Sequence, residues 1–239
     1  MVSADDNTAA NTAARPPAIT REALVAAGMA VLRREGLDAL SMRKVAAELG
    51  VRAASLYYHV QDKEQLLDLL ADSVVWDARK LATTGDWERC LREAAHAYYR
   101  HLHANRDAAR LMAGRRTAGP NLLYVLDVMM GRLHAGGFSD ADAAWATLTM
   151  ATYVQGFVLQ EQTPKPALKE KRADVGQYPN IAALIDVLVG DNSQELFAFG
   201  VERIIDGLRI RRTAESENPS GNPPERPTCA DTAPPPAQR

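Results

Sequence analysis

The helical spacing of apolar residues is the feature that most limits how this chain can fold. Between residues 20 and 211, large apolar side chains recur at intervals of three and four residues, and no run alternates as a half-buried strand does. Thr20 and Ser41 are good N-caps, whereas Gly36 and Gly50 can end the helices that follow them. The sequence therefore predicts an all-α protein.

The spacing also predicts where the helices lie. They are Thr20 to Gly36, Ser41 to Gly50, a short third helix holding Leu56 and Val60, Asp62 to about Lys80, Trp87 to His103, Leu122 to Ala135, Asp140 to about Gln162, Ile181 to Val189, and Ser193 to Arg211. Residues 163–178 are predicted to form a loop. The short helices at the front and the longer ones behind them predict a small N-terminal module and a larger C-terminal one.

Composition indicates an ordinary globular protein with two tails. Of the 239 residues, 46% are apolar, which is enough for a sizeable core. Residues 1–18 and 212–239 hold almost no large apolar side chains and are predicted to be disordered, although Arg15 could reach a DNA minor groove as part of an arm. No segment reads as a signal peptide or a membrane span, so the expected location is the cytoplasm, with no membrane partner. Cys90 and Cys229 fit neither a disulfide framework nor a metal motif.

Charge is unevenly distributed along the chain. The net charge is −2, but residues 15–63 hold eight Lys and Arg against five Asp and Glu, a local +3. A basic N-terminal module is compatible with phosphate contact. Many solvated surfaces have the same balance, so charge alone does not decide the function.

The segment Ser41–Val60 is predicted to be a helix-turn-helix. The small residues Ala46 and Ala47 allow two helices to cross closely, and Gly50 can adopt the left-handed conformation that turns the chain. Leu56 and Val60 would then point inward from the second helix. A recognition helix this short can offer only its first turn and outer face to DNA bases.

The side chains left facing outward suit DNA. Arg43 can pair with guanine through two hydrogen bonds, and small alanines can approach a thymine methyl group. Polar and basic groups nearby can bind phosphates and fix the register. The predicted DNA-contacting residues are Ser41, Arg43, Lys44, Ala53, Ala54, Ser55, Tyr57, Tyr58, His59 and Lys63.

The spacing alone leaves one alternative open, a helix pair buried in an ordinary bundle with tyrosines in the core. The run Tyr57-Tyr58-His59 counts against this alternative, because three successive bulky residues with polar tips cannot all face one core.

At these residues the chain resembles the TetR/AcrR family of transcription regulators. The stretch SMRKVAAELGVRAASLYYHVQDKEQLLDLL is similar to the family's DNA-binding signature along its whole length. Further segments resemble the C-terminal domain of the tetracycline-repressor subgroup: DW, NRDAARLMAG, AGGFSDADAAWATL, QGFVLQEQ and FAFGVERIIDGL. The resemblance covers roughly residues 19–210.

The resemblance implies a DNA-binding domain at 19–79, with its helix-turn-helix at 41–60, and a ligand-binding and dimerisation domain at 80–211. It further implies a homodimer paired through helices of about residues 140–162 and 193–211, a palindromic double-stranded DNA operator, and a small-molecule effector that releases the DNA. The sequence agrees, because Gly156 and Gly200 permit close helix approach. It also holds apolar surface beyond the needs of a monomer, at Phe197, Phe199, Ile204 and Leu208.

The chain departs from the subgroup at the positions that bind a magnesium–tetracycline chelate. Met112, Thr152 and Gln160 stand where the resemblance leads one to expect two histidines and a glutamate. A thioether is a poor ligand for Mg²⁺, which prefers hard oxygen ligands. We therefore expect no metal site, no cofactor, and a largely apolar, aromatic effector in place of magnesium–tetracycline.

The predicted effector pocket has aromatic and methionine walls with a few polar groups. Its candidate residues are Trp76, Arg79, Tyr98, Met112, Tyr124, Met129, Trp145, Thr149, Thr152 and Tyr153. Each of them is also compatible with a plain core position, and Arg79 can meet either an anionic ligand group or a salt-bridge partner.

Other classes of function find little support in the sequence. His96, His101, His103 and His134 lie in no metal-binding motif, and no phosphate loop or nucleophile motif is present, so no catalytic residue is predicted. The predicted function is a ligand-released repressor. A transcriptional activator of the same family, or more remotely an all-helical enzyme or carrier, is the alternative.

Overall fold

The computed structural model describes residues 19–75, 86–113, 115, 119–163 and 174–217, and these contain helices and no strand. The elements are α1 (Arg21–Glu35), α2 (Met42–Glu48), α3 (Ala53–Leu56), α4 (Lys63–Val74), α5 (Trp87–Ala104), α6 (Ala108–Met112), α7 (Pro120–Ala135), α8 (Asp140–Gln162), the 3₁₀ turn η2 (Asp174–Gln177), α9 (Pro179–Val189) and α10 (Ser193–Glu217). The predicted all-α class is confirmed.

Several details differ from the sequence expectation, among them the 3₁₀ turn η2, which lies within the predicted loop at residues 163–178. The short helix α6 was not predicted, because Asn105 to Gly114 offers a single turn with no stripe of its own. The third helix ends at Leu56, and Val60 is buried from the following turn instead of from the helix. Helix α10 continues to Glu217, past the predicted end at Arg211.

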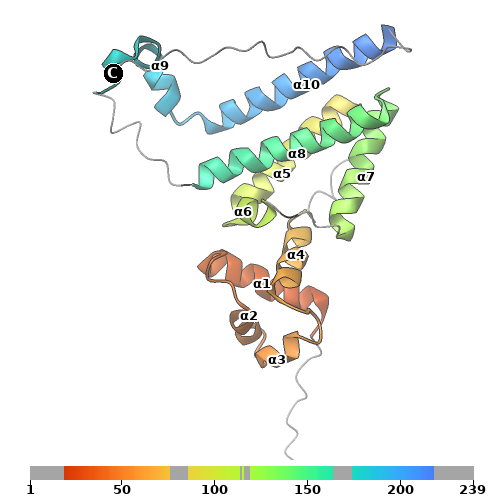
Figure 1. Cartoon of the computed structure of the whole chain (residues 1–239), viewed down its shortest axis with the longest axis vertical. Helices are drawn as coiled ribbons and strands as arrows, with labels where there is room; N and C mark the ends of the chain where they lie inside the picture. The colour runs from red at the N-terminus through yellow and green to blue at the C-terminus, as the bar shows by residue number, and fades with distance from the viewer. Residues whose placement is uncertain (1–18, 76–85, 114, 116–118, 164–173, 218–239) are drawn as a thin grey trace, which may run out of the picture.

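Helices α1 to α4 form a head at one end of the molecule (Figure 1). Side-chain oxygens of Thr20, Ser41 and Asp62 accept backbone N–H bonds at the starts of α1, α2 and α4, which satisfies donors that a helix start otherwise leaves without partners. One fully buried cluster joins the four helices: Leu24, Leu32, Leu40, Val45, Leu56, Leu66 and Leu70.

The rear of the molecule is built on α5, α7 and α8, with α10 lying across α5 and α8 (Figure 1). Phe197 of α10 is buried and stacks between Tyr99 of α5 and Tyr153 of α8, at ring-centroid distances of 4.3 and 5.7 Å. The expectation that Phe197 is surplus to a monomer is therefore wrong, because these two rings of the same chain cover it. The Arg92–Glu202 ion pair also ties α10 to α5 and lowers the pKa of the Glu202 carboxyl. In the described part of the chain, no helix is both long and apolar enough to cross a membrane.

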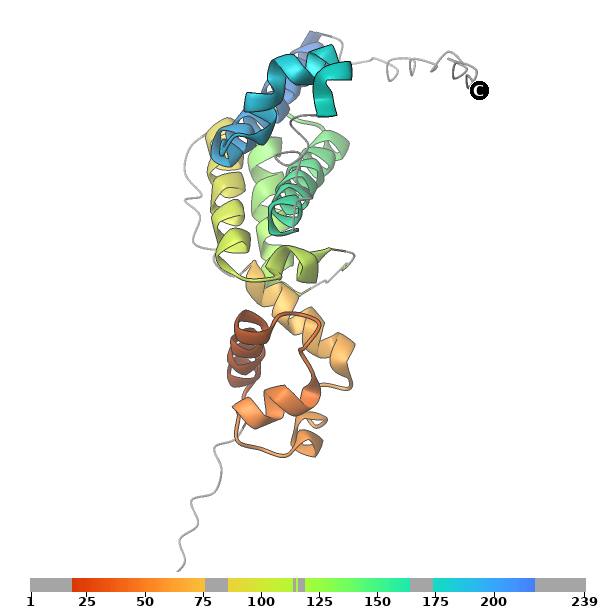
Figure 2. The same cartoon turned by 90° about the vertical axis from the view of Figure 1, so that its left-hand side faces the viewer.

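The head meets the rear through α4 and α6 (Figure 2). The Asp107 carboxylate, in the loop before α6, accepts from the backbone N–H of Leu37 at 2.8 Å. Arg110 of α6 makes two hydrogen bonds to Asp38, at 2.6 and 2.8 Å. These contacts hold the α1–α2 turn against the rear helices.

Candidate nucleic-acid interface and internal cavity

Helices α2 and α3 are joined by a tight turn at Gly50. Gly50 has φ +67°, a left-handed conformation that favours glycine, and the N–H of Val51 donates to the carbonyl of Ala46 at 2.9 Å. Leu56 and Val60 are almost fully buried, at 0% and 2% exposure. The turn and these two anchors fix the outer face of α3 at the surface of the head.

The residues predicted to contact DNA lie on this outer surface. Tyr57 and Tyr58 are 55% and 91% exposed, so they do not belong to a core as the buried-pair alternative required. The other exposed members are Arg43, Lys44, Ala54, His59 and Lys63, and the half-buried ones are Ser41, Ala53 and Ser55. The structure therefore brings the whole predicted set to one end of the head.

Ion pairs distinguish the basic residues of this surface. Lys44 contacts Glu35 at 2.6 Å, and this hydrogen bond, followed by one from Arg34, lowers the pKa of the Glu35 carboxyl. Arg43 and Lys63 have no ion pair within the described residues, and neither has Arg52, which precedes α3 and was not predicted as a contact. The position of Arg52 directly before the recognition helix α3 could have identified it as a further candidate DNA contact.

An apolar cavity of about 80 Å³ lies between α5, α7 and α8, next to the end of α4. It is lined by Val75, Leu91, Ala94, Ala95, Tyr98, Leu122, Val125, Leu126, Met129, Thr147, Met150, Ala151, Val154 and Gln155. The Gln155 side-chain amide donates to the Tyr98 hydroxyl at 3.0 Å. Burial raises the pKa of Tyr98, so this phenol stays protonated and keeps its own O–H to donate.

Only two of the predicted effector residues that the structure describes, Tyr98 and Met129, line this cavity. Trp145, Thr149 and Thr152 lie on the opposite, exposed face of α8. The remaining three are also elsewhere: Met112 is buried in α6, Tyr124 is exposed, and the Tyr153 hydroxyl donates to the Phe197 carbonyl at 3.1 Å. Trp76 and Arg79 lie outside the described residues.

Sequence reasoning missed most of the cavity wall. Leu91, Ala94, Ala95 and Tyr98 recur at helical spacing along α5, which identifies one inward stripe. Gln155 carries no comparable signal, because a polar residue on a helix usually faces water. Its position becomes clear only from the hydrogen bond to Tyr98.

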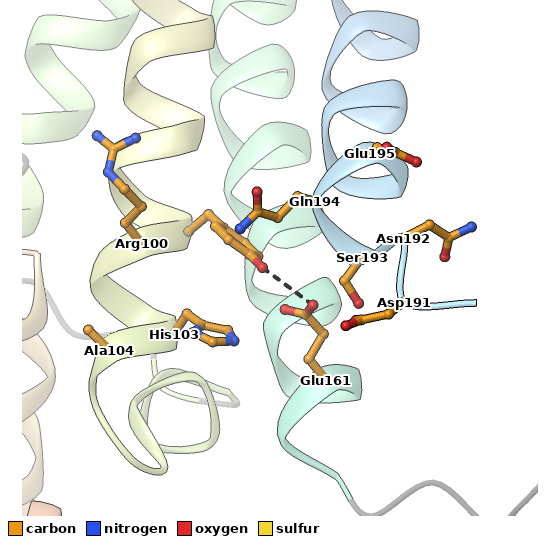
Figure 3. Close-up of a pocket in the computed structure, with 10 residues that line it drawn as sticks. Arg100, His103, Ala104, Glu161, Asp191, Asn192, Ser193, Gln194 and Glu195 are labelled. Carbon is orange, nitrogen blue, oxygen red and sulfur yellow. Dashed lines mark hydrogen bonds between the residues drawn. The ribbon is translucent and has the colours of Figure 1, made fainter. Parts of the chain in front are cut away.

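A second, polar hollow of about 640 Å³ lies where α5 and α8 end and α10 begins (Figure 3). There the Tyr99 hydroxyl donates to Glu161 at 3.3 Å, and burial together with this carboxylate raises the pKa of Tyr99 to about 12. His103 stacks on the Tyr99 ring at 5.6 Å. No group of three or more metal-binding side chains gathers anywhere in the described part of the chain.

A helix-turn-helix head with exposed basic and aromatic side chains, joined to a helical body with an internal cavity, defines a one-component DNA-binding regulator. Family models agree with both halves: residues 24–70 match the "Bacterial regulatory proteins, tetR family" domain, and residues 81–212 match the "Tetracyclin repressor-like, C-terminal domain". The chain belongs to the TetR family of bacterial regulatory proteins.

Individual relatives resemble the chain over most of its length. The class A tetracycline repressor from transposon 1721 of Escherichia coli is 32% identical, over 79% of this chain and 90% of its own. The structure of ActR of Streptomyces coelicolor without ligand has a TM-score of 0.75 at 29% identity, over 84% of this chain and 98% of its own. ActR has also been solved with actinorhodin. A BioQ protein has been solved with its double-stranded DNA operator, and that structure has a TM-score of 0.58 at 26% identity, over 80% of this chain and 98% of its own.

Proposed function

We propose that this protein represses transcription by binding a palindromic operator as a homodimer, and that a largely apolar, ring-bearing molecule in the α5–α7–α8 cavity releases it. The observation that carries the proposal is the exposed surface of α2, α3 and the start of α4. There Tyr58 is 91% exposed, and Arg43 and Lys63 form no ion pair within the described residues. The BioQ–operator complex supports DNA as the partner of this surface.

Base reading and phosphate binding fall to different residues in this proposal. Arg43 reads a guanine, and the exposed Ala54 approaches a thymine methyl group. Tyr57, Tyr58 and Lys63 bind phosphates on either side of the groove, helped by the N-terminus of α4, whose dipole favours an anion. Lys44 contributes less than its position suggests, because Glu35 already neutralises it.

Replacing Lys63 with alanine should weaken binding to every DNA sequence, because a phosphate contact carries no base information. The slope of log affinity against log salt should fall by about one per protomer. Arg43→Ala is the matched comparison: it should cost about 1–3 kcal/mol only on operators with the contacted guanine. Fluorescence anisotropy on wild-type and base-substituted duplexes measures both. Equal losses on all duplexes for Arg43→Ala would remove it from base reading.

The dimer is proposed to form through the outward faces of α8 and α10. Trp145, Leu148 and Gly156 on α8, and Leu196 and Phe199 on α10, leave an apolar stripe exposed on the single chain. A Cβ added at Gly156 would meet nothing within 4 Å, so that face is open to a second copy. A Cβ at Gly200 would instead overlap the Tyr153 hydroxyl, so Gly200 serves packing within the chain.

The effector is proposed to be an aromatic compound with a hydrogen-bonding group on its ring. Apolar walls favour the ring, while the Tyr98 hydroxyl and the Gln155 amide can bind a carbonyl or hydroxyl group. The ActR–actinorhodin complex supports this class of compound for a protein of this shape. Magnesium–tetracycline is not expected, because Met112 is buried and Thr152 and Gln160 lie on the outer face of α8.

Binding of a ring compound should therefore be independent of Mg²⁺. In titration calorimetry, actinorhodin should bind equally with and without the metal. Gln155→Leu should weaken binding by about 1–3 kcal/mol, because a buried polar group of the ligand loses the Gln155 amide as its partner. Gln61→Leu is the control, because Gln61 is exposed in the head and lies away from the cavity and from the proposed dimer face, so the affinity should be unchanged. Micromolar tetracycline binding that depends on Mg²⁺ would contradict the proposed ligand class.

A reporter gene placed behind the DNA upstream of this protein's own gene separates repressor from activator. Production of the protein should lower expression of the reporter, and Tyr58→Ala should restore it. Expression that rises with the protein and falls with Tyr58→Ala would assign activation instead.

A further inference from the structure

We infer that Asp72 couples the cavity to the DNA-binding head, by capping helix α7 from helix α4; this inference rests on the proposed function. Asp72 is 3% exposed, in the last turn of α4. One carboxylate oxygen accepts from the backbone N–H groups of Asn121 and Leu122 at 3.1 and 3.0 Å. In return, the Asn121 side-chain amide donates to the Asp72 carbonyl at 3.3 Å.

Helix α7 depends on this distant carboxylate because it has no cap of its own. The first N–H groups of a helix have no partner within it, and a Ser, Thr, Asp or Asn at the N-cap usually accepts from them. The N-cap of α7 is Gly119, which has no side chain and makes no side-chain cap bond. Asp72 takes over that role from another helix.

Glycine is required at position 119 by the closeness of the two helices. A Cβ added there would overlap the Asp72 carboxylate. The start of α7 is thus packed closely against α4. If the first turn of α7 moves, either Asp72 moves with it or the hydrogen bonds to Asp72 break. A break would leave buried N–H groups and a buried carboxylate without partners, which is unfavourable.

Both sides of this link also form walls of the cavity. The side chain of Leu122 lines it from α7, and Val75 lines it from the end of α4. The cavity holds about 80 Å³, whereas a drug-sized ligand needs about 300–1,000 Å³. A ring compound must therefore push these walls apart, and Asp72 carries the displacement of α7 to α4.

Helix α4 leads directly to the DNA-binding surface, since it begins at Lys63, just after the helix-turn-helix, and runs from the head to the rear (Figure 2). Within the described residues, the other carboxylates that join the head to the rear are exposed, at Asp38, Glu64 and Asp68, or half-buried, at Asp107. Exposed ion pairs are screened by solvent and contribute little. Asp72 is the buried connection, so we assign the coupling to it.

The test uses Cys90 of α5 as a reporter of cavity opening. Cys90 is 3% exposed, and its sulfur lies 4.0 Å from the sulfur of Met129, a cavity residue. Burial raises the pKa of this thiol, so alkylation should require opening. Because coupling between two sites is reciprocal, bound operator should hold the cavity closed. The measurement is the rate of alkylation by iodoacetamide in a Cys229→Ser background, with and without a saturating operator duplex.

In the otherwise unchanged protein, operator should slow the alkylation of Cys90 by about fivefold or more. In Asp72→Ala, the alkylation rates of Cys90 with and without a saturating amount of the same duplex should agree within about twofold, because the coupling is lost. Gly119→Ala disrupts the same contact from α7 and should also remove the effect of operator on alkylation. The double variant with Asp72→Ala and Gly119→Ala should show no further loss. Asp72→Asn retains an acceptor oxygen and should keep part of the effect.

Asp127→Asn is the matched control, because it removes a carboxylate from an exposed position of α7 and should keep the full effect. The inference is overturned if Asp72→Ala or Gly119→Ala binds operator and still slows alkylation as the parent does. It is also overturned if operator leaves the parent's alkylation rate unchanged. If Asp72→Ala fails to fold, Gly119→Ala and Asp72→Asn decide. Absence of any DNA binding by the parent would defeat the proposed function instead.

Discussion

Replacing Phe199 with aspartate should yield a folded monomer whose operator affinity is lower by about 100-fold or more. The Phe199 side chain is 63% exposed on the outward face of α10, so the single chain loses little when it is changed. In the proposed dimer the same side chain is buried, and an unpaired carboxylate there is costly. A monomer binds one half-site and loses the gain of about 10²–10⁴ from linking two.

Light scattering gives the mass, and anisotropy with an operator duplex gives the affinity. Leu123→Asp is the matched control, because Leu123 of α7 is 54% exposed and lies outside the proposed interface. That variant should remain dimeric. A dimeric Phe199→Asp protein, or a monomer that binds operator as tightly as the dimer, would contradict the assignment of α8 and α10 to the interface.

Replacing Leu56 with alanine should destabilise the head by about 2–5 kcal/mol, the usual cost of truncating a fully buried leucine. Leu56 has no exposed surface and anchors the four-residue helix α3 to the head's core. Because α3 is too short to hold itself together, loss of this anchor should also abolish operator binding.

Tyr58→Ala is the comparison within the same stretch of chain. Tyr58 is 91% exposed, so its removal should leave the free energy of unfolding almost unchanged while weakening operator binding. Urea denaturation and anisotropy measure the two quantities. If Tyr58→Ala destabilised the protein as much as Leu56→Ala, the proposed orientation of α3 would be wrong.

The DNA-binding surface was predictable from sequence because its signals are local. Ser41 caps α2, Gly50 turns the chain, and Leu56 anchors α3, all within a stretch that has one apolar face. The exposed Tyr57 and Tyr58 follow from the same pattern, since bulky neighbours cannot share a core.

The cavity was not predictable in the same way, because α8 is apolar on two faces. Its inward face carries Thr147, Met150 and Val154, and its outward face carries Trp145 and Leu148. Helical spacing reveals both stripes but does not say which one faces the chain's own core. The outward aromatic was therefore assigned to the pocket, whereas we now propose that it faces a second copy.

Asp72 shows a second limit of sequence reasoning. A single Asp in an amphipathic helix reads as a solvated position, and nothing near it in the sequence indicates burial. Its partners, Asn121 and Leu122, are about fifty residues away, and the unusual N-cap at Gly119 has meaning only once α4 and α7 are seen in contact.

The most direct test of the account is a nuclease footprint on the DNA upstream of the protein's own gene. We expect one protected stretch with two-fold symmetry, its half-sites separated by about one helical turn or a multiple of it, and protection that weakens steeply with salt. Tyr58→Ala and Phe199→Asp should each lose it. No protection at low salt, or protection that both variants retain, would contradict the account.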